Sequence, residues 1–232
     1  MTGGDGSEGG RPERFPGFDV LSQANRWDPV TAGTVLSRLS PQPGVRFLTQ
    51  AEQAAASALL DQLLGQVDES KVPVVQMIDA RLAEQQTDGW RYEDMPEDGT
   101  AWRDSLCYLD SDAVEAFGAG FAACSGKEQA ELVQRVQDLG SADWHGLAAG
   151  HVWSLWTRYA CTAFYSHPLA WNEIGFPGPA YPRGYKNAGV DAREPYEVRD
   201  AQPSQDPVRE QDPVREQDPE QDPEQDPVRE GA

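Results

Sequence analysis

The fold is decided by residues 49–65, which read TQAEQAAASALLDQLLG. Thr49 and Glu52 have the spacing of a capping box, in which the Thr hydroxyl accepts from the third helical N–H group and the Glu side chain reaches back. Apolar residues then recur at helical spacing up to Gly65, at Ala54, Ala58, Leu59, Leu63 and Leu64. The stretch predicts an amphipathic helix that begins at Thr49 and ends at Gly65.

Four more stretches have the periodicity of amphipathic helices, at about 73–89, 100–117, 125–139 and 142–165. Pro73 suits a first helical position, and Ser125 and Glu128 form a second capping box. The inward-facing residues are expected to be Val74, Met77, Ile78 and Leu82 in the first; Trp102, Leu106, Leu109 and Ala113 in the second; Leu132, Val136 and Leu139 in the third; and Leu147, Val152, Leu155, Trp156 and Tyr159 in the last. No run alternates as a strand, so we predict an all-α domain of about five helices.

The composition excludes several classes of partner. The chain has 232 residues and a formal net charge of −20, with 39 acidic and 19 basic residues. Such a surface repels polyanions, which argues against nucleic-acid binding and against docking on an anionic membrane. No apolar run of about 18 residues occurs, so no transmembrane helix is expected.

The ends of the sequence differ from its middle. Residues 1–18 are rich in Gly and are expected to be disordered, and they show no signal peptide, so a cytoplasmic location is expected. Residues 201–232 repeat the unit QDPVRE or QDPE and are expected to form a disordered acidic tail. Residues 19–200 are expected to form one helical domain. Its three cysteines, Cys107, Cys124 and Cys161, fit no metal or disulfide pattern and are interpreted as free buried thiols.

A second change of texture occurs at residues 167–185, where Pro and Gly alternate with aromatic residues. Aromatic content distinguishes this segment from the acidic tail. We expect it to form an ordered, irregular flap that lies on the helices or on a partner.

Few residues suggest catalysis. His151 lies on the apolar stripe of the longest helix and is interpreted as a core histidine, while His167 is expected to be a cation at the end of that helix. The sequence has no nucleophile elbow, P-loop or dinucleotide fingerprint. An acid–base cluster of His167 with Glu173 or Asp143 stays open as an alternative. The aromatic content favours an interaction subunit over an enzyme.

Five segments together resemble the gluconate 2-dehydrogenase subunit 3 family. They are RFLTQAE at 46–52, IDARL at 78–82, GWRY at 89–92, FYSHP at 164–168 and WNEIGFPGP at 171–179. The last of these is the most specific, and the resemblance covers about residues 46–182. Members typically have an Asp-Pro step where this sequence has His167-Pro168.

The resemblance implies a non-catalytic small subunit that binds no cofactor itself. In this family it accompanies a large FAD-dependent oxidoreductase of the glucose-methanol-choline type, often with a cytochrome c subunit, and the large subunit of several complexes also holds an iron–sulfur cluster. The small subunit is thought to assist folding, cofactor loading and export. Family members often have a twin-arginine signal, which this sequence lacks, so either the complex stays in the cytoplasm or a signal-bearing partner exports it.

The expected function is therefore an accessory subunit that binds, matures and stabilises an FAD-dependent sugar or alcohol dehydrogenase. A transient maturation chaperone and an independent enzyme using His167 remain as alternatives. The expected partner interface is the flap, and its contact residues would be His167, Trp171, Asn172, Ile174, Gly175, Phe176, Pro177, Gly178 and Tyr181.

Overall fold

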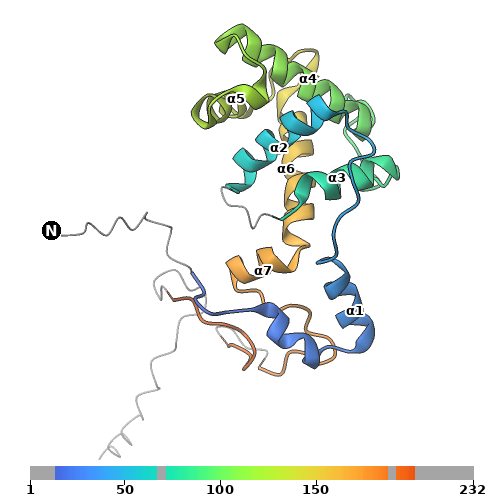
Figure 1. Cartoon of the computed structure of the whole chain (residues 1–232), viewed down its shortest axis with the longest axis vertical. Coiled ribbons are helices and arrows are strands. Elements are labelled where there is room, and N and C mark those ends of the chain that lie inside the picture. The colour runs from blue at the N-terminus through green and yellow to red at the C-terminus, as the bar shows by residue number, and fades with distance from the viewer. Residues whose placement is uncertain (1–13, 67–71, 188–191, 202–232) are drawn as a thin grey trace, which may run out of the picture.

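The computed structural model of the chain describes residues 14–66, 72–187 and 192–201. This part is mostly helical, with one hairpin of two short strands, which confirms the predicted all-α class (Figure 1). The elements are η1 (Val20–Arg26), α1 (Pro29–Ser37), α2 (Gln50–Leu64), α3 (Val74–Ala83), α4 (Asp98–Phe117), η2 (Phe121–Ala123), α5 (Gly126–Asp138), β1 (Asp143–Trp144), β2 (Leu147–Ala148), α6 (Ala149–Tyr165) and α7 (Pro168–Ile174), where η marks a 3-10 helix. None of the described helices is long and apolar enough to cross a bilayer.

Both predicted capping boxes are present. At the start of α2, the Glu52 amide donates to the Thr49 hydroxyl over 3.3 Å, and the Thr49 amide donates to the Glu52 carboxylate over 2.7 Å. Gly65 ends the helix with φ of 63°. The buried face differs from the predicted one, because α2 buries Ala55, Ala56, Leu59 and Leu60, whereas Ala54 is exposed. The predicted face of α2 is rotated by about one residue from the buried face, because the neighbouring helices contact the side of Ala55, Ala56, Leu59 and Leu60.

Helices α2 to α6 form one bundle in which α6 contacts all of the other four. Side chains from α2, α4, η2 and α6 fill its centre, and the largest that are fully buried are Trp102, Trp156, Tyr159, Phe121, Leu59 and Leu60. The indole nitrogen of Trp156 donates to the Ser105 hydroxyl over 2.9 Å, so this buried polar atom is satisfied. The predicted core face of α4 is confirmed at all four of its residues.

Several predicted boundaries are wrong. Helix α3 ends at Ala83 rather than near Gly89, and Leu139 lies past the end of α5 with an exposed side chain. The longest predicted helix begins seven residues late, at Ala149, because residues 143–148 form a hairpin of two short strands in which Trp144 pairs with Leu147. His145 and Gly146 both have positive φ, 54° and 86°, as the tight turn requires.

The two ends of the described chain meet in a second, smaller unit beside the bundle. We call residues 14–40, 166–187 and 192–201 the terminal module. Its core joins Val20, Trp27 and Val35 from the N-terminal side to Trp171 from the C-terminal side. Arg14 forms an ion pair with Asp200, and the Ala201 amide donates to the Arg14 carbonyl over 3.0 Å. Residues 14–18 of the predicted disordered tail take part in these contacts, whereas residues 1–13 and 202–232 lie outside the described residues.

Candidate functional site

The predicted flap begins with a helix rather than an irregular loop. Pro168 occupies the first turn of α7, and Gly175 ends the helix with φ of 67°. His167 caps the helix, since its ring Nδ1 accepts the Leu169 amide over 3.3 Å. The signals for this helix were present in the sequence, because Pro at the first position and Gly just past the end are typical of short helices.

His167 is neutral in this setting, which corrects the expectation of a cation at the end of α6. The side chain is 3% exposed, and burial holds the pKa of the imidazole below its ordinary value. The nearby charge of Arg38 lowers the pKa further, while a hydrogen bond to the Arg38 backbone acts in the opposite direction. A nitrogen that accepts an amide hydrogen bond carries no proton, so its capping role also requires the neutral form.

The structure does not assemble the acid–base cluster of the alternative hypothesis. His167 follows the C-terminal end of α6, whereas Asp143 precedes its N-terminal end. A helix of 17 residues is about 25 Å long, so these two residues lie at opposite ends of it. Among the described residues, no hydrogen bond or ion pair joins His167 to Glu173 or Asp143.

Two of the predicted contact residues hold the terminal module together instead of facing outward. Trp171 is 5% exposed, its indole nitrogen donates to the Tyr165 carbonyl over 2.7 Å, and the Arg38 guanidinium lies 5.8 Å from its ring centroid. The Asn172 amide oxygen accepts the Val20 amide over 2.8 Å. Both side chains therefore bind the N-terminal segment of the same chain.

The two glycines of the flap allow close approaches within the module. A Cβ on Gly175 would lie 2.6 Å from the Phe15 ring, and a Cβ on Gly178 would lie 2.4 Å from the Trp27 ring. Both glycines have positive φ, 67° and 78°, which side chains disfavour. Pro177, between Phe176 and Gly178, is also buried.

The remaining predicted contact residues are exposed. Ile174, Phe176 and Tyr181 present 45%, 36% and 68% of their surface to solvent. The Phe176 ring packs edge-on against Trp171 with centroids 5.2 Å apart, so the outer ring is held by the buried one. The interface predicted for the flap therefore stays a prediction, and it now rests on these three side chains.

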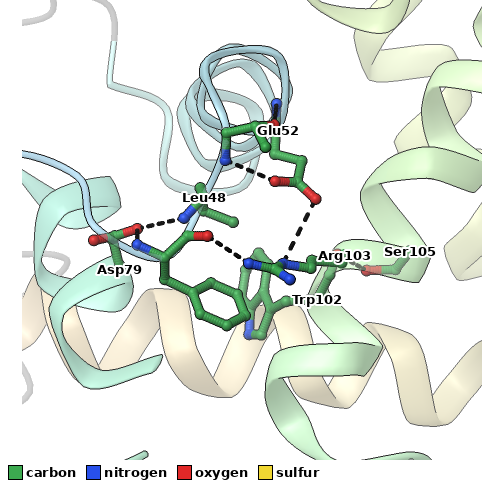
Figure 2. A network of polar contacts seen from close by, with 8 residues as sticks. Leu48, Glu52, Asp79, Trp102, Arg103 and Ser105 are labelled. Carbon is green, nitrogen blue, oxygen red and sulfur yellow. Dashed lines mark hydrogen bonds and ion pairs between the residues drawn. The ribbon is translucent and has the colours of Figure 1, made fainter. Parts of the chain in front are cut away.

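The first two family-like segments meet around a buried carboxylate at the entry to α2. Asp79 is 1% exposed, and its carboxylate accepts the backbone amides of Arg46, Phe47 and Leu48 over 2.6, 2.9 and 2.8 Å. Figure 2 shows this carboxylate beneath the turn that precedes α2, with Arg103 of α4 reaching the same turn from the other side. Arg103 donates to the Phe47 carbonyl over 2.6 Å and pairs with Glu52 over 3.8 Å.

The connection between α3 and α4 runs along α6 as an exposed strap, residues 84–97. Alternate strap residues contact two side chains of α6. Asp88 pairs with Arg158 over 3.2 Å, and the Trp90 ring lies 4.5 Å from the same guanidinium. His151 stacks on Tyr92 and pairs with Asp94 over 2.9 Å. The interpretation of His151 as a core histidine is therefore wrong, because its stripe position faces the strap rather than the core.

A pocket of about 730 Å³ lies between this strap, the N-terminal turn of α4 and the entry to α2. No sequence pattern indicates this pocket, because its lining comes from four separated segments. Its walls include Phe47, Trp90, Arg91, Arg103 and Tyr159. The Tyr159 hydroxyl donates to the Asp98 carboxylate over 2.6 Å. Burial and this hydrogen bond raise the pKa of the Tyr159 phenol, so it stays protonated.

The described residues hold no group of three or more His, Cys, Asp or Glu side chains placed to bind a metal ion. Two of the cysteines, Cys107 and Cys161, are exposed free thiols, and the buried Cys124 is also free. The three thiols are free as predicted, but the prediction that they are buried is correct only for Cys124.

The bundle and the start of the flap match a known protein family. The model of the family described as gluconate 2-dehydrogenase subunit 3 matches residues 50–178, which spans α2 to α7 and ends inside the flap. No curated protein and no solved structure gives a significant match. The matched range covers more than half of the chain and contains the bundle, the strap and α7. The chain is a member of the gluconate 2-dehydrogenase subunit 3 family.

Proposed function

We propose that this chain is the non-catalytic small subunit of a dehydrogenase complex, which binds, matures and stabilises an FAD-dependent large subunit that oxidises a sugar or alcohol. Family membership carries the proposal, because the family is that of a subunit of gluconate 2-dehydrogenase. The large subunit would be of the glucose-methanol-choline type and would hold the FAD, with an iron–sulfur cluster as a further cofactor there. A cytochrome c subunit would complete the complex.

The exposed side chains of the flap support the proposal. Ile174 and Tyr181 project from a segment whose other side is fixed by Trp171 and the two glycines. A rigid support that holds apolar side chains in solvent is what a preorganised interface needs.

The test is affinity purification of the tagged chain from its native cells, followed by an absorbance spectrum of the eluate. A flavin-containing large chain at near-equal stoichiometry is the expected result. A flavoprotein present only at low stoichiometry, and lost after its flavin is loaded, would favour the transient chaperone. A colourless single chain, in cells that express the large subunit, would contradict the proposal.

A pair of matched variants tests the flap itself. Ile174→Gln with Tyr181→Gln should reduce recovery of the large subunit at least tenfold. Val114→Gln with Leu139→Gln is the control, because these exposed apolar side chains lie on α4 and at the end of α5, in the bundle. Equal recovery with both double variants would show that the flap is not the interface.

A further inference from the structure

Exposed apolar side chains are concentrated in the terminal module. Among the described residues, thirteen large apolar side chains are exposed, and eight of them belong to this module although it is the smaller part. Those eight are Val30, Leu36, Leu39, Leu169, Ile174, Phe176, Tyr181 and Tyr185. Soluble surfaces rarely gather apolar side chains without a binding role.

Charge is distributed in the opposite way. Residues 41–165 contain nineteen acidic and eight basic residues, so the bundle is strongly negative. The described residues of the terminal module contain six acidic and seven basic residues, so the module is close to neutral. Because protein interfaces are depleted of charge at their centres, the module is the part of this surface best suited to contact another protein.

Helix α1 is the least covered element of the module. Its sequence, PVTAGTVLS, contains no charged residue, and Val35 is its only buried side chain. Val30 and Leu36 are 78% and 43% exposed. At 100° per residue Val30, Val35 and Leu36 point to three different sides, and only the side of Val35 is covered. The polar residues of the helix, Thr31, Thr34 and Ser37, are all uncharged.

Helix α1 is nevertheless well defined at its start. The Asp28 carboxylate accepts the amides of Val30 and Thr31 over 3.0 and 3.3 Å, and Pro29 fixes the first helical position. The hydroxyls of Thr34 and Ser37 donate to the carbonyls of Val30 and Thr34, each over 2.9 Å, so both are satisfied within the helix. A capped helix of this kind presents Val30 in a fixed position.

We propose that α1 is a second docking element, whose Val30 and Leu36 side chains are covered by an apolar, weakly charged surface of the large subunit. The inference rests on the proposed function, and it goes beyond it because α1 precedes the range that the family model matches. The small subunit would then bind its partner through two separate segments, α1 and the exposed side of the flap, which the buried core of Trp171 and Val35 joins.

The rest of this chain is a poor candidate to cover α1. Residues 1–13 and 202–232 contain no aromatic residue, and their large aliphatic residues are Met1 and three valines within the acidic repeats. A second copy is also disfavoured, because two chains of net charge −20 repel each other. A different chain with a neutral or basic surface could supply apolar side chains and would not be repelled by the charge of this one.

The experiment measures the affinity of the purified chain for the flavin-containing large subunit isolated in the purification described above. Val30→Gln with Leu36→Gln should raise the Kd at least tenfold, whereas Val114→Gln with Leu139→Gln should leave it unchanged. Both pairs replace exposed side chains in or at the end of a helix, and neither should alter the melting temperature of the isolated chain. An unchanged Kd for the α1 variant would overturn the inference.

The same binding measurement separates this inference from the proposed function. If the flap variant loses binding while the α1 variant binds normally, the proposed function stands and only the α1 inference fails. If the wild-type chain does not bind the large subunit, the proposed function fails.

Amide exchange of the wild-type complex gives a test without substitutions. Binding should protect the amides of residues 30–39, and unchanged exchange there would contradict the inference. A dimer of the isolated chain that the α1 variant dissociates would identify a second copy as the occupant and would also overturn it.

Discussion

The carboxylate of Asp79, on α3, lies 2.8 Å from the backbone nitrogen of Leu48, at the entry to α2. The same carboxylate accepts two more amides of that turn, so one side chain satisfies three donors that the turn leaves without backbone partners. Helices α2 and α3 are thus joined by a buried ionic cap rather than by apolar packing alone.

Replacing Asp79 by Ala should lower the free energy of unfolding by about 3 kcal/mol, because buried donors lose charge-assisted hydrogen bonds. Asp79→Asn should cost less, since its one amide oxygen can still accept from Phe47 and Leu48, although its NH₂ group opposes the Arg46 amide. Chemical denaturation of both variants measures the difference. A smaller loss for Ala than for Asn would contradict this account of the cap.

Replacing Trp171 by Ala should destabilise the terminal module by about 3 to 5 kcal/mol, the usual cost of truncating a large buried aromatic side chain. The indole hydrogen bond to Tyr165 and the packing with Val20 would be lost together. Amide exchange should therefore accelerate in residues 14–40, far away in sequence. Trp90→Ala is the matched control, because Trp90 is 51% exposed and stacks on Arg158, a contact worth about 1 kcal/mol or less. Similar losses for the two variants would refute the assignment of Trp171 to the core.

The buried neutral imidazole of His167 predicts a pH dependence of stability. Its pKa is lower in the folded chain than the ordinary value of 6.5, so below that pH the unfolded chain binds more protons than the folded one. The free energy of unfolding should therefore fall as the pH drops below about 6.5, until the folded-state pKa is passed.

His167→Asn tests this source of the pH dependence, because Asn retains a side-chain acceptor for the Leu169 amide but does not titrate. Denaturation at several pH values between neutral and mildly acidic should show a shallower decline in this variant. His151→Asn, which alters a contact of the strap, should keep the contribution of His167. An unchanged decline in His167→Asn would show that other groups produce it.

Glycine substitutions test the close approach within the module. Gly178→Ala places a Cβ 2.4 Å from the Trp27 ring and also strains the backbone, since φ is 78°. Gly184→Ala meets nothing within 4 Å and has a similar φ of 69°, so it isolates the backbone strain of about 1 kcal/mol. The melting temperature should fall further for Gly178→Ala than for Gly184→Ala, and equal decreases would show that the ring yields without cost.

The bundle was predictable because its signals are local. Capping boxes and apolar residues spaced by about 3.6 positions predict α2 and α5. The inward face of α4 follows from the spacing of its apolar residues alone. The face of α2 was misplaced because Ala is found both inside and outside a fold, so the pattern defines that stripe weakly. The hairpin at 143–148 could not be predicted, because strands of two residues are too short to show an alternation of apolar and polar residues.

The terminal module was not predictable in the same way. Helix α1 has one buried side chain, and its polar residues are small and uncharged, so its sequence shows no clear apolar period. Trp171 and Tyr181 are both aromatic residues of a Pro- and Gly-rich segment, yet one is buried and the other is 68% exposed. The difference arises from Val20 and Trp27, which cover Trp171 but lie more than 140 residues away in the chain. Sequence patterns identify the segment, but only its tertiary contacts determine which of its aromatic side chains are buried and which are exposed.

The meeting of Arg14 with Asp200 also sets the order in which this protein is built during synthesis. The bundle has all of its helices once residue 165 has left the ribosome, whereas Val20 and Val35 have to wait for Trp171, and Arg14 for residues near the end of the described chain. Contacts between distant residues close slowly, since a long loop has to be ordered first. A nascent chain can therefore complete its acidic bundle before the core of its terminal module closes around Trp171.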